Sequence, residues 1–153
     1  MIQGTVEAIF VARYGGTKMA RVSEVEALAG FGLKGDRYSV GAGYWSGIDE
    51  CQVTLIAGED LDEISATTGI RVQDGEHRRN LVTRGVRLAD LAGKKFKVGR
   101  AVLEYDRPRP PCTYIESLTE PGMARALARR AGICARVLES GPIRVGDRIE
   151  IGG

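Results

Sequence analysis

Apolar and polar residues alternate in many short runs along the chain, which is the two-residue repeat of a half-buried strand. In the first run, from Ile2 to Val11, apolar side chains fall at even positions as far as Phe10. The run CQVTLIA at residues 51–57 is mostly apolar, which is typical of a buried strand. The pattern predicts strands at residues 2–11, 19–29, 51–57, 77–85, 133–138 and 143–151, a hairpin joining residues 96–98 to 102–103 through Gly99 and Arg100, and turns at Gly141–Pro142 and Gly146–Asp147.

Three segments have a helical pattern instead. Residues 58–68 carry apolar side chains at helical spacing, and residues 88–91 fit a single turn. Residues 121–131 begin with proline, continue with alanines and end before Gly132, the asymmetry that helices favour. Residues 19–29 also fit an amphipathic helix, although we favour the strand. Seven or eight short strands with two or three short helices predict a mainly β fold, a barrel or sandwich, in a single domain.

Composition and charge narrow the function classes. The 153 residues carry 22 basic and 20 acidic side chains, and a net charge of +2 does not favour nucleic acid. No apolar run approaches the roughly 20 residues that a membrane span needs, and no signal peptide pattern follows Met1. The three widely spaced cysteines fit a reducing compartment. We therefore expect a soluble cytoplasmic protein, with Cys51 and Cys134 packed in the core and at least one free thiol.

The stretch RPRPPCTYIE, residues 107–116, presents Cys112 behind three prolines and two arginines. The prolines stiffen the backbone before the thiol. Nearby cations favour the thiolate, the form that attacks sulfur and binds metals, and Arg107 and Arg109 could also hold an anion. A structural cysteine in a proline-kinked loop is the alternative that these residues leave open.

A second motif, GLKGDR at residues 32–37, lies in the glycine-rich segment 30–47. On residue types alone it fits a loop in which glycines adopt positive φ and Asp36 caps a turn. The pair Tyr44 and Trp45 in the same segment either covers a flat ligand or anchors the loop to the fold.

A third motif, RRN at residues 78–80, is followed by Arg84 and Gly85. It fits either an exposed strand end or a binding site for phosphate. His77, the single histidine, lies in the charged stretch GEHRRN, and we expect it at the surface rather than as a base for Cys112. With no CxxC pair, a structural zinc site is not expected.

In this order, the motifs resemble those of the MOSC domain, the module named for the C-terminal part of molybdenum cofactor sulfurase, and in particular its small stand-alone bacterial members. The resemblance covers nearly the whole of residues 1–153. The stretches that carry it are GLKGDR, RRN followed by Gly85, the path from LADLAGKKFKVGRAVLE into Pro111–Cys112, and the closing VLESGPIRVGDRIEI.

The resemblance implies a mostly β, barrel-like single domain. It implies that Cys112 either carries sulfane sulfur as a persulfide or coordinates the molybdenum of the molybdenum cofactor (molybdopterin), an anionic phosphorylated pterin. Its partners would then be a cysteine desulfurase or a separate redox protein. The cofactor-binding residues that we assign are Asp36, Arg37, Arg79, Asn80, Arg84 and Arg109.

The chain also departs from the family. Tyr38 follows Arg37 where many relatives have a histidine nearby, and no pyridoxal-phosphate desulfurase domain is present, so we expect no pyridoxal phosphate.

Two other functions stay open. One is a molybdenum-dependent reductase of N-hydroxylated compounds, which would need an external electron donor because no flavin, haem or iron–sulfur motif occurs. The other is a non-catalytic module that binds an anionic phosphorylated ligand.

Overall fold

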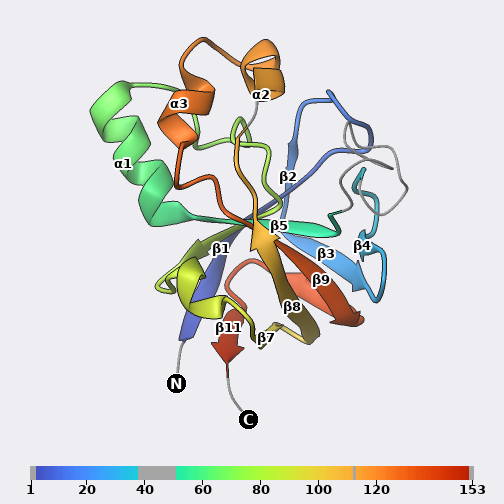
Figure 1. Cartoon of the computed structure of the whole chain (residues 1–153). Helices are drawn as coiled ribbons and strands as arrows, with labels where there is room; N and C mark the ends of the chain where they lie inside the picture. The colour runs from blue at the N-terminus through green and yellow to red at the C-terminus, as the bar shows by residue number, and fades with distance from the viewer. Residues whose placement is uncertain (1–2, 38–50, 112, 152–153) are drawn as a thin grey trace.

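The computed structural model of the chain describes residues 3–37, 51–111 and 113–151. Within these ranges short strands dominate, and the helices are short (Figure 1). The strands are β1 (Gln3–Val11), β2 (Ala20–Val22), β3 (Glu24–Leu28), β4 (Gly32–Leu33), β5 (Val53–Ala57), β6 (Leu81–Arg84), β7 (Lys95–Val98), β8 (Ala101–Pro108), β9 (Ile133–Glu139), β10 (Gly141–Arg144) and β11 (Arg148–Ile151). The helices are α1 (Gly58–Thr68), the 3-10 turn η1 (Leu88–Leu91), α2 (Thr113–Leu118) and α3 (Met123–Leu127).

Seven of the described strands close into a barrel. Their order is β1, β11, β7, β8, β9, β5 and β6, and β6 pairs again with β1. The β5–β6 pair is parallel because α1 carries the chain back between them, and the other neighbours are antiparallel. β2 extends the sheet beside β1, and β10, β3 and β4 form a separate small sheet. Closure pairs the edges that an open sheet would leave exposed.

Two hydrophobic cores lie on opposite faces of the barrel strands. Successive side chains of a strand point to opposite faces, so Ile9 joins a core shared by the strands around the barrel, whereas Phe10 joins a core shared with the helices. The second core includes Leu61 and Ile64 of α1 and Met123 of α3. The three α-helices gather at one end of the molecule, and the start of β1 and the end of β11 lie at the other (Figure 1).

Most predicted elements are confirmed. The first strand, the strand assignment of residues 19–29, the helix at residues 58–68, the turn at residues 88–91 and the hairpin around Gly99 and Arg100 all occur. Mainly β architecture in a barrel is likewise confirmed.

Several details of the prediction are wrong. The described part contains eleven strands rather than seven or eight, because short pairs such as β3–β4 have too few residues to show a pattern. The late helix spans only Met123–Leu127, and Arg129 has a positive φ of 66° that no α-helix allows. The helix α2 was not predicted at all.

The environments of the histidine and two cysteines also differ from expectation. His77 is completely buried rather than at the surface, because it packs edge-on against Phe10 with ring centroids 5.2 Å apart. Cys51 and Cys134 are buried as predicted, but they form a disulfide, with Cα atoms 5.9 Å apart, instead of packing as free thiols. In the described ranges, no helix has the length and apolar character to cross a membrane.

Candidate functional site

Five of the predicted site residues lie together in a buried polar cluster. Asp36 and Arg37 follow β4, Arg79 and Asn80 precede β6, and Arg109 follows β8. Their exposed fractions range from 0% for Asp36 and Asn80 to 7% for Arg109. Charged side chains are rarely so buried unless a specific arrangement holds them. We call the set Arg37, Arg78, Arg79 and Arg109, with Asp36 and Asn80, the arginine cluster.

The Asp36–Arg37 pair fixes the GD motif to the end of β1. The Asp36 Oδ1 atom accepts hydrogen bonds from the Ala12 backbone N–H at 3.0 Å and from the Arg37 guanidinium at 3.1 Å. Arg37 also donates to the Met19 sulfur at 3.4 Å and to the Arg78 carbonyl at 3.1 Å. A buried ion pair of this kind is held by its extra hydrogen bonds. It therefore joins the first motif to the RRN motif.

Arg78 adopts a backbone conformation that few residues other than glycine tolerate. Its φ is 64°, in the left-handed region, and its side chain donates to the Thr17 carbonyl at 2.7 Å. The turn is closed by a hydrogen bond from the Arg78 N–H to the Gly75 carbonyl at 2.9 Å. Strained backbone of this type is concentrated at functional sites.

The neutral imidazole of His77 stabilises the same turn by accepting a backbone hydrogen bond. Its Nδ1 atom accepts the Arg79 backbone N–H at 2.9 Å, so the ring proton is on Nε2, which has no hydrogen-bond partner in the described structure. Burial, and after it the cationic side chains of Arg79, Arg21 and Arg78, together lower the pKa of His77 to about 3. His77 therefore stays uncharged at neutral pH.

Arg79 connects the RRN motif to the segment that leads to Cys112. Its Nε atom donates to the Ala131 carbonyl at 2.6 Å, and its Nη2 atom donates to the Arg109 carbonyl at 3.2 Å. The Arg109 N–H in turn donates to the Gly132 carbonyl at 2.9 Å. Gly132 suits this close approach, since a side chain there would collide with the Leu55 carbonyl. Arg79 thus fixes the backbone three residues before Cys112.

Asn80 binds three strands together. Its side-chain oxygen accepts from the Thr54 N–H at 3.0 Å and the Thr54 hydroxyl at 3.1 Å, and its amide donates to the Phe10 carbonyl at 3.1 Å. These bonds leave one amide N–H for any further contact. Asn80 therefore has a clear structural role beside any role in binding.

Arg84 lies apart from the arginine cluster. Its guanidinium, partly exposed, pairs with Glu7 at 2.7 Å and with Asp62 at 2.8 Å. The hydrogen bond from Arg84 lowers the pKa of the Asp62 carboxyl and raises the pKa of Arg84 itself. We leave Arg84 out of the proposed site for this reason.

Several sequence predictions fall on residues outside the described ranges. They are Cys112, Tyr38 and the pair Tyr44–Trp45. The described neighbours of Cys112 are Pro111, which is partly buried, and the first turn of α2.

Two residues of this region were missed by the sequence reasoning. Arg78 was noted only as part of its motif, and His77 was assigned to the surface. A stretch of four polar residues, HRRN, gives no local sign of burial. The single histidine next to the motif was the one usable signal. Its Nδ1 atom accepts a backbone N–H, and such a bond leaves no trace in the residue types around it.

A profile of the MOSC domain matches residues 42–150, which is more than half of the chain. The chain belongs to the MOSC domain family. The family is related to the C-terminal domains of molybdenum cofactor sulfurases. The matched range contains Arg79, Asn80 and Arg109 as well as Cys112, whereas the GD motif precedes it.

Solved structures with the same fold include other bacterial MOSC-like chains. The YuaD protein of Bacillus subtilis has a TM-score of 0.79 at 18% identity, over 97% of this chain and 95% of that one. YiiM of Geobacillus stearothermophilus gives 0.75 at 17% identity, over 98% and 75% of the two chains. YiiM of Escherichia coli gives 0.67 at 20% identity, over 100% and 71%. A search of curated protein sequences gives no match. At these identities the structures support the MOSC fold alone.

Proposed function

We propose that this MOSC protein binds the molybdenum cofactor, or carries sulfur destined for it, through the thiolate of Cys112. The observation that carries the proposal is the hydrogen bond from Arg79 to the Arg109 carbonyl. It joins the buried RRN motif to the backbone three residues before the cysteine. The motifs that define the resemblance are therefore physically connected, although they are far apart in the sequence.

The side chains of the arginine cluster fit an anionic cofactor. The cluster contains four buried arginines, Arg37, Arg78, Arg79 and Arg109, and hydrogen bonds from Arg37 and Arg79 join the backbone segments that carry them. Guanidinium groups bind phosphate through paired charged hydrogen bonds, and they do so more strongly where water is excluded. Arg37, Arg79 and Arg109 would hold the anionic part of the cofactor, which when bound would supply a metal centre for ligation by a thiolate.

The two arginines that precede Cys112 in the sequence, Arg107 and Arg109, also suit sulfur transfer. Nearby guanidinium groups stabilise the thiolate form of a cysteine. In the transfer step that we propose, the Cys112 thiolate attacks the terminal sulfur of a persulfide on a cysteine desulfurase. The S–S bond of the donor breaks, its cysteine leaves as a thiolate with the electron pair of that bond, and a new S–S bond forms on Cys112. Atoms and electrons balance, and no further oxidant is required.

The decisive test is elemental and mass analysis of the protein isolated from its native host. The expected result is bound molybdenum, or an added sulfur atom on the peptide that contains Cys112. Cys112→Ala should lose whichever cargo the wild type carries, and Arg84→Ala, outside the arginine cluster, should retain it. A wild-type protein that holds neither molybdenum nor extra sulfur, even after incubation with a desulfurase and cysteine, would exclude the proposal.

A further inference from the structure

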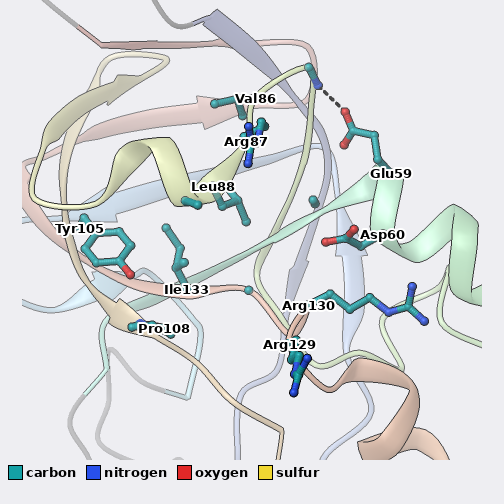
Figure 2. A pocket seen from close by; sticks show the side chains of 14 residues that line it. Glu59, Asp60, Val86, Arg87, Leu88, Tyr105, Pro108, Arg129, Arg130 and Ile133 are labelled. Carbon is teal, nitrogen blue, oxygen red and sulfur yellow. Dashed lines mark hydrogen bonds between the residues drawn. The ribbon is translucent and has the colours of Figure 1, made fainter.

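A cavity of about 610 Å³ lies at one end of the barrel, and no residue of the arginine cluster lines it (Figure 2). It opens where β5, β6 and β8 end and β9 begins, and residues of α1 and of the segment leading into η1 complete its wall. We call it the barrel-end cavity. Its size falls in the range of small-molecule sites, which often occupy the mouths of β-barrels.

One wall of the barrel-end cavity is apolar. Val86, Leu88, Tyr105 and Ile133 line it, and all four belong to the barrel core or pack against it. Figure 2 shows Leu88, Tyr105 and Ile133 around the same space. A ligand with an apolar or aromatic body would bury that body here and gain the free energy of removing apolar surface from water.

The Asp60 carboxylate faces this wall, and none of the described residues forms a hydrogen bond or an ion pair with it. Asp60, in the first turn of α1, lines the cavity and is partly buried. Figure 2 shows the carboxylate directed toward the interior of the cavity. Burial raises the pKa of Asp60, Arg130 opposes the rise, and Glu63 and Glu59 add to it.

The other charged groups around the cavity are engaged elsewhere or lie at its rim. Glu59 accepts the Gly85 N–H at 2.8 Å. Arg130 donates to the Glu63 carboxylate at 3.0 Å and extends away from Asp60 (Figure 2). Arg87 and Arg129 line the cavity but are exposed to solvent. The polar group that best defines ligand orientation is therefore Asp60.

We propose that the barrel-end cavity is a binding site for a small organic cation, an amine or amidine on an apolar body, with Asp60 as its counter-ion. This goes beyond the proposed function, because the arginine cluster suits anions and this cavity suits a cation. A cationic nitrogen would make a charge-assisted hydrogen bond to Asp60 while its body packs on Leu88, Tyr105 and Ile133. The exposed arginines at the rim leave room for a second, anionic group on a larger ligand.

Three probes of one shape test the charge preference by NMR titration of the full chain. They are benzylamine as the cation, benzyl alcohol as the neutral analogue and phenylacetate as the anion. Benzylamine should bind about tenfold or more tightly than benzyl alcohol, in keeping with one charged hydrogen bond. Benzyl alcohol or phenylacetate binding as tightly as benzylamine would overturn the proposal, as would no binding of benzylamine.

Matched variants locate the site. Asp60→Asn should weaken benzylamine binding about tenfold and leave benzyl alcohol unchanged, while Asp90→Asn, an exposed acid on η1 that does not line the cavity, should change neither. Ala89→Trp places a large ring at the exposed edge of the cavity and should abolish the binding of every probe. If Asp60→Asn keeps full benzylamine affinity, Asp60 merely stabilises the start of α1 and the inference fails. Loss of molybdenum or sulfur on Cys112 would not affect these outcomes.

Discussion

The arginine cluster and the barrel-end cavity treat charge in opposite ways. In the cluster, arginines are buried and hydrogen-bonded to backbone carbonyls of other segments, such as Ala131 and Arg109. In the cavity, the Asp60 carboxylate faces an apolar wall, and no described group forms a hydrogen bond or a close ion pair with it, although the charge of Arg130 lowers its pKa. The cluster is part of the scaffold, whereas the cavity is a surface feature that the scaffold leaves open.

Because of this difference, substitutions in the two regions should have different effects on the free energy of unfolding and on ligand binding. Each arginine of the cluster that donates to a buried backbone carbonyl stabilises the fold, because replacing the arginine leaves that carbonyl without a partner. It can contribute to a ligand site at the same time. A change in the cluster should therefore affect both the free energy of unfolding and ligand binding. A change of the Asp60 carboxylate should affect binding far more than folding, because no hydrogen bond joins this carboxylate to another described segment.

The largest difference in the free energy of unfolding is expected between the variants Asn80→Ala and Asp60→Asn. Asn80→Ala leaves the buried Thr54 N–H and Phe10 carbonyl without partners, and each such group costs about 1–3 kcal/mol. We expect a total loss of about 3–5 kcal/mol in the free energy of unfolding, measured by urea denaturation. Asp60→Asn should change it by less than about 1 kcal/mol. Similar losses in the two variants would contradict the separation of scaffold and cavity.

The second effect is a pH dependence of the free energy of unfolding that comes from His77, beside the arginine cluster. The unfolded chain protonates His77 near its ordinary pKa of 6.5, but the folded chain does so only near 3. The unfolded state therefore binds more protons between these values, and stability falls as the pH drops below 6.5 by roughly 1.4 kcal/mol per pH unit. Full stability from this residue is present above pH 6.5. We expect a loss of about 2 kcal/mol between pH 6.5 and pH 5.

His77→Asn isolates this effect. An asparagine oxygen can accept the Arg79 N–H in place of Nδ1, because asparagine forms this bond to its own backbone two residues on. The variant does not titrate in this range, so its stability between pH 6.5 and 5 should be about 2 kcal/mol less pH-dependent than that of the wild type. Unfolding curves at several pH values measure this. Equal slopes for both proteins would mean that His77 is protonated in the folded chain.

The features that the sequence could predict are those with a local pattern. Strands such as residues 2–11 follow from alternation, and the helix at residues 58–68 follows from spacing, because these signals are local. The pairing of β1 with β11 and the disulfide of Cys51 with Cys134 depend on contacts between distant segments. No local pattern carries that information.

Within the site, residue types alone were informative only in part. The motif residues Asp36, Arg79 and Asn80 were identified by their resemblance to a family, and Arg37 joins the two segments that carry them through its bonds to Asp36 and to the Arg78 carbonyl. The burial of His77 was not predictable, because the ring of Phe10 and the turn at Arg78 create its environment. The barrel-end cavity gave no sequence signal, since its walls come from three strands, two helical segments and the loops beside them.

A third effect concerns the two described residues other than glycine with positive φ, one in each region. Arg129 at the rim of the cavity has a φ of 66° and an exposed side chain. Arg129→Gly relieves the left-handed strain and should stabilise the protein by roughly 0.5–1 kcal/mol, after the entropy that glycine adds to the unfolded chain. Arg78→Gly relieves the same strain but loses the bond to Thr17, and should destabilise by about 1 kcal/mol. Thermal unfolding measures both, and a gain from both variants would show that the Arg78 side chain contributes nothing to the scaffold.

The smallest effect should come from Arg84, which belongs to neither region although its motif position suggested a role in binding. Its guanidinium is partly exposed and pairs with Glu7 and Asp62. Arg84→Ala should cost about 0.5–1 kcal/mol, less at high salt, because exposed ion pairs contribute little and are screened. Arg136→Ala, which removes another exposed arginine between two carboxylates, is the matched control and should cost about as much.

The pKa of Asp62, followed by NMR, should rise toward its ordinary value in Arg84→Ala because the hydrogen bond that lowers it is gone. If Arg84→Ala instead removed molybdenum or sulfur from the protein, the site would extend along β6 beyond the arginine cluster, and an exposed ion pair would have to open for the ligand to bind.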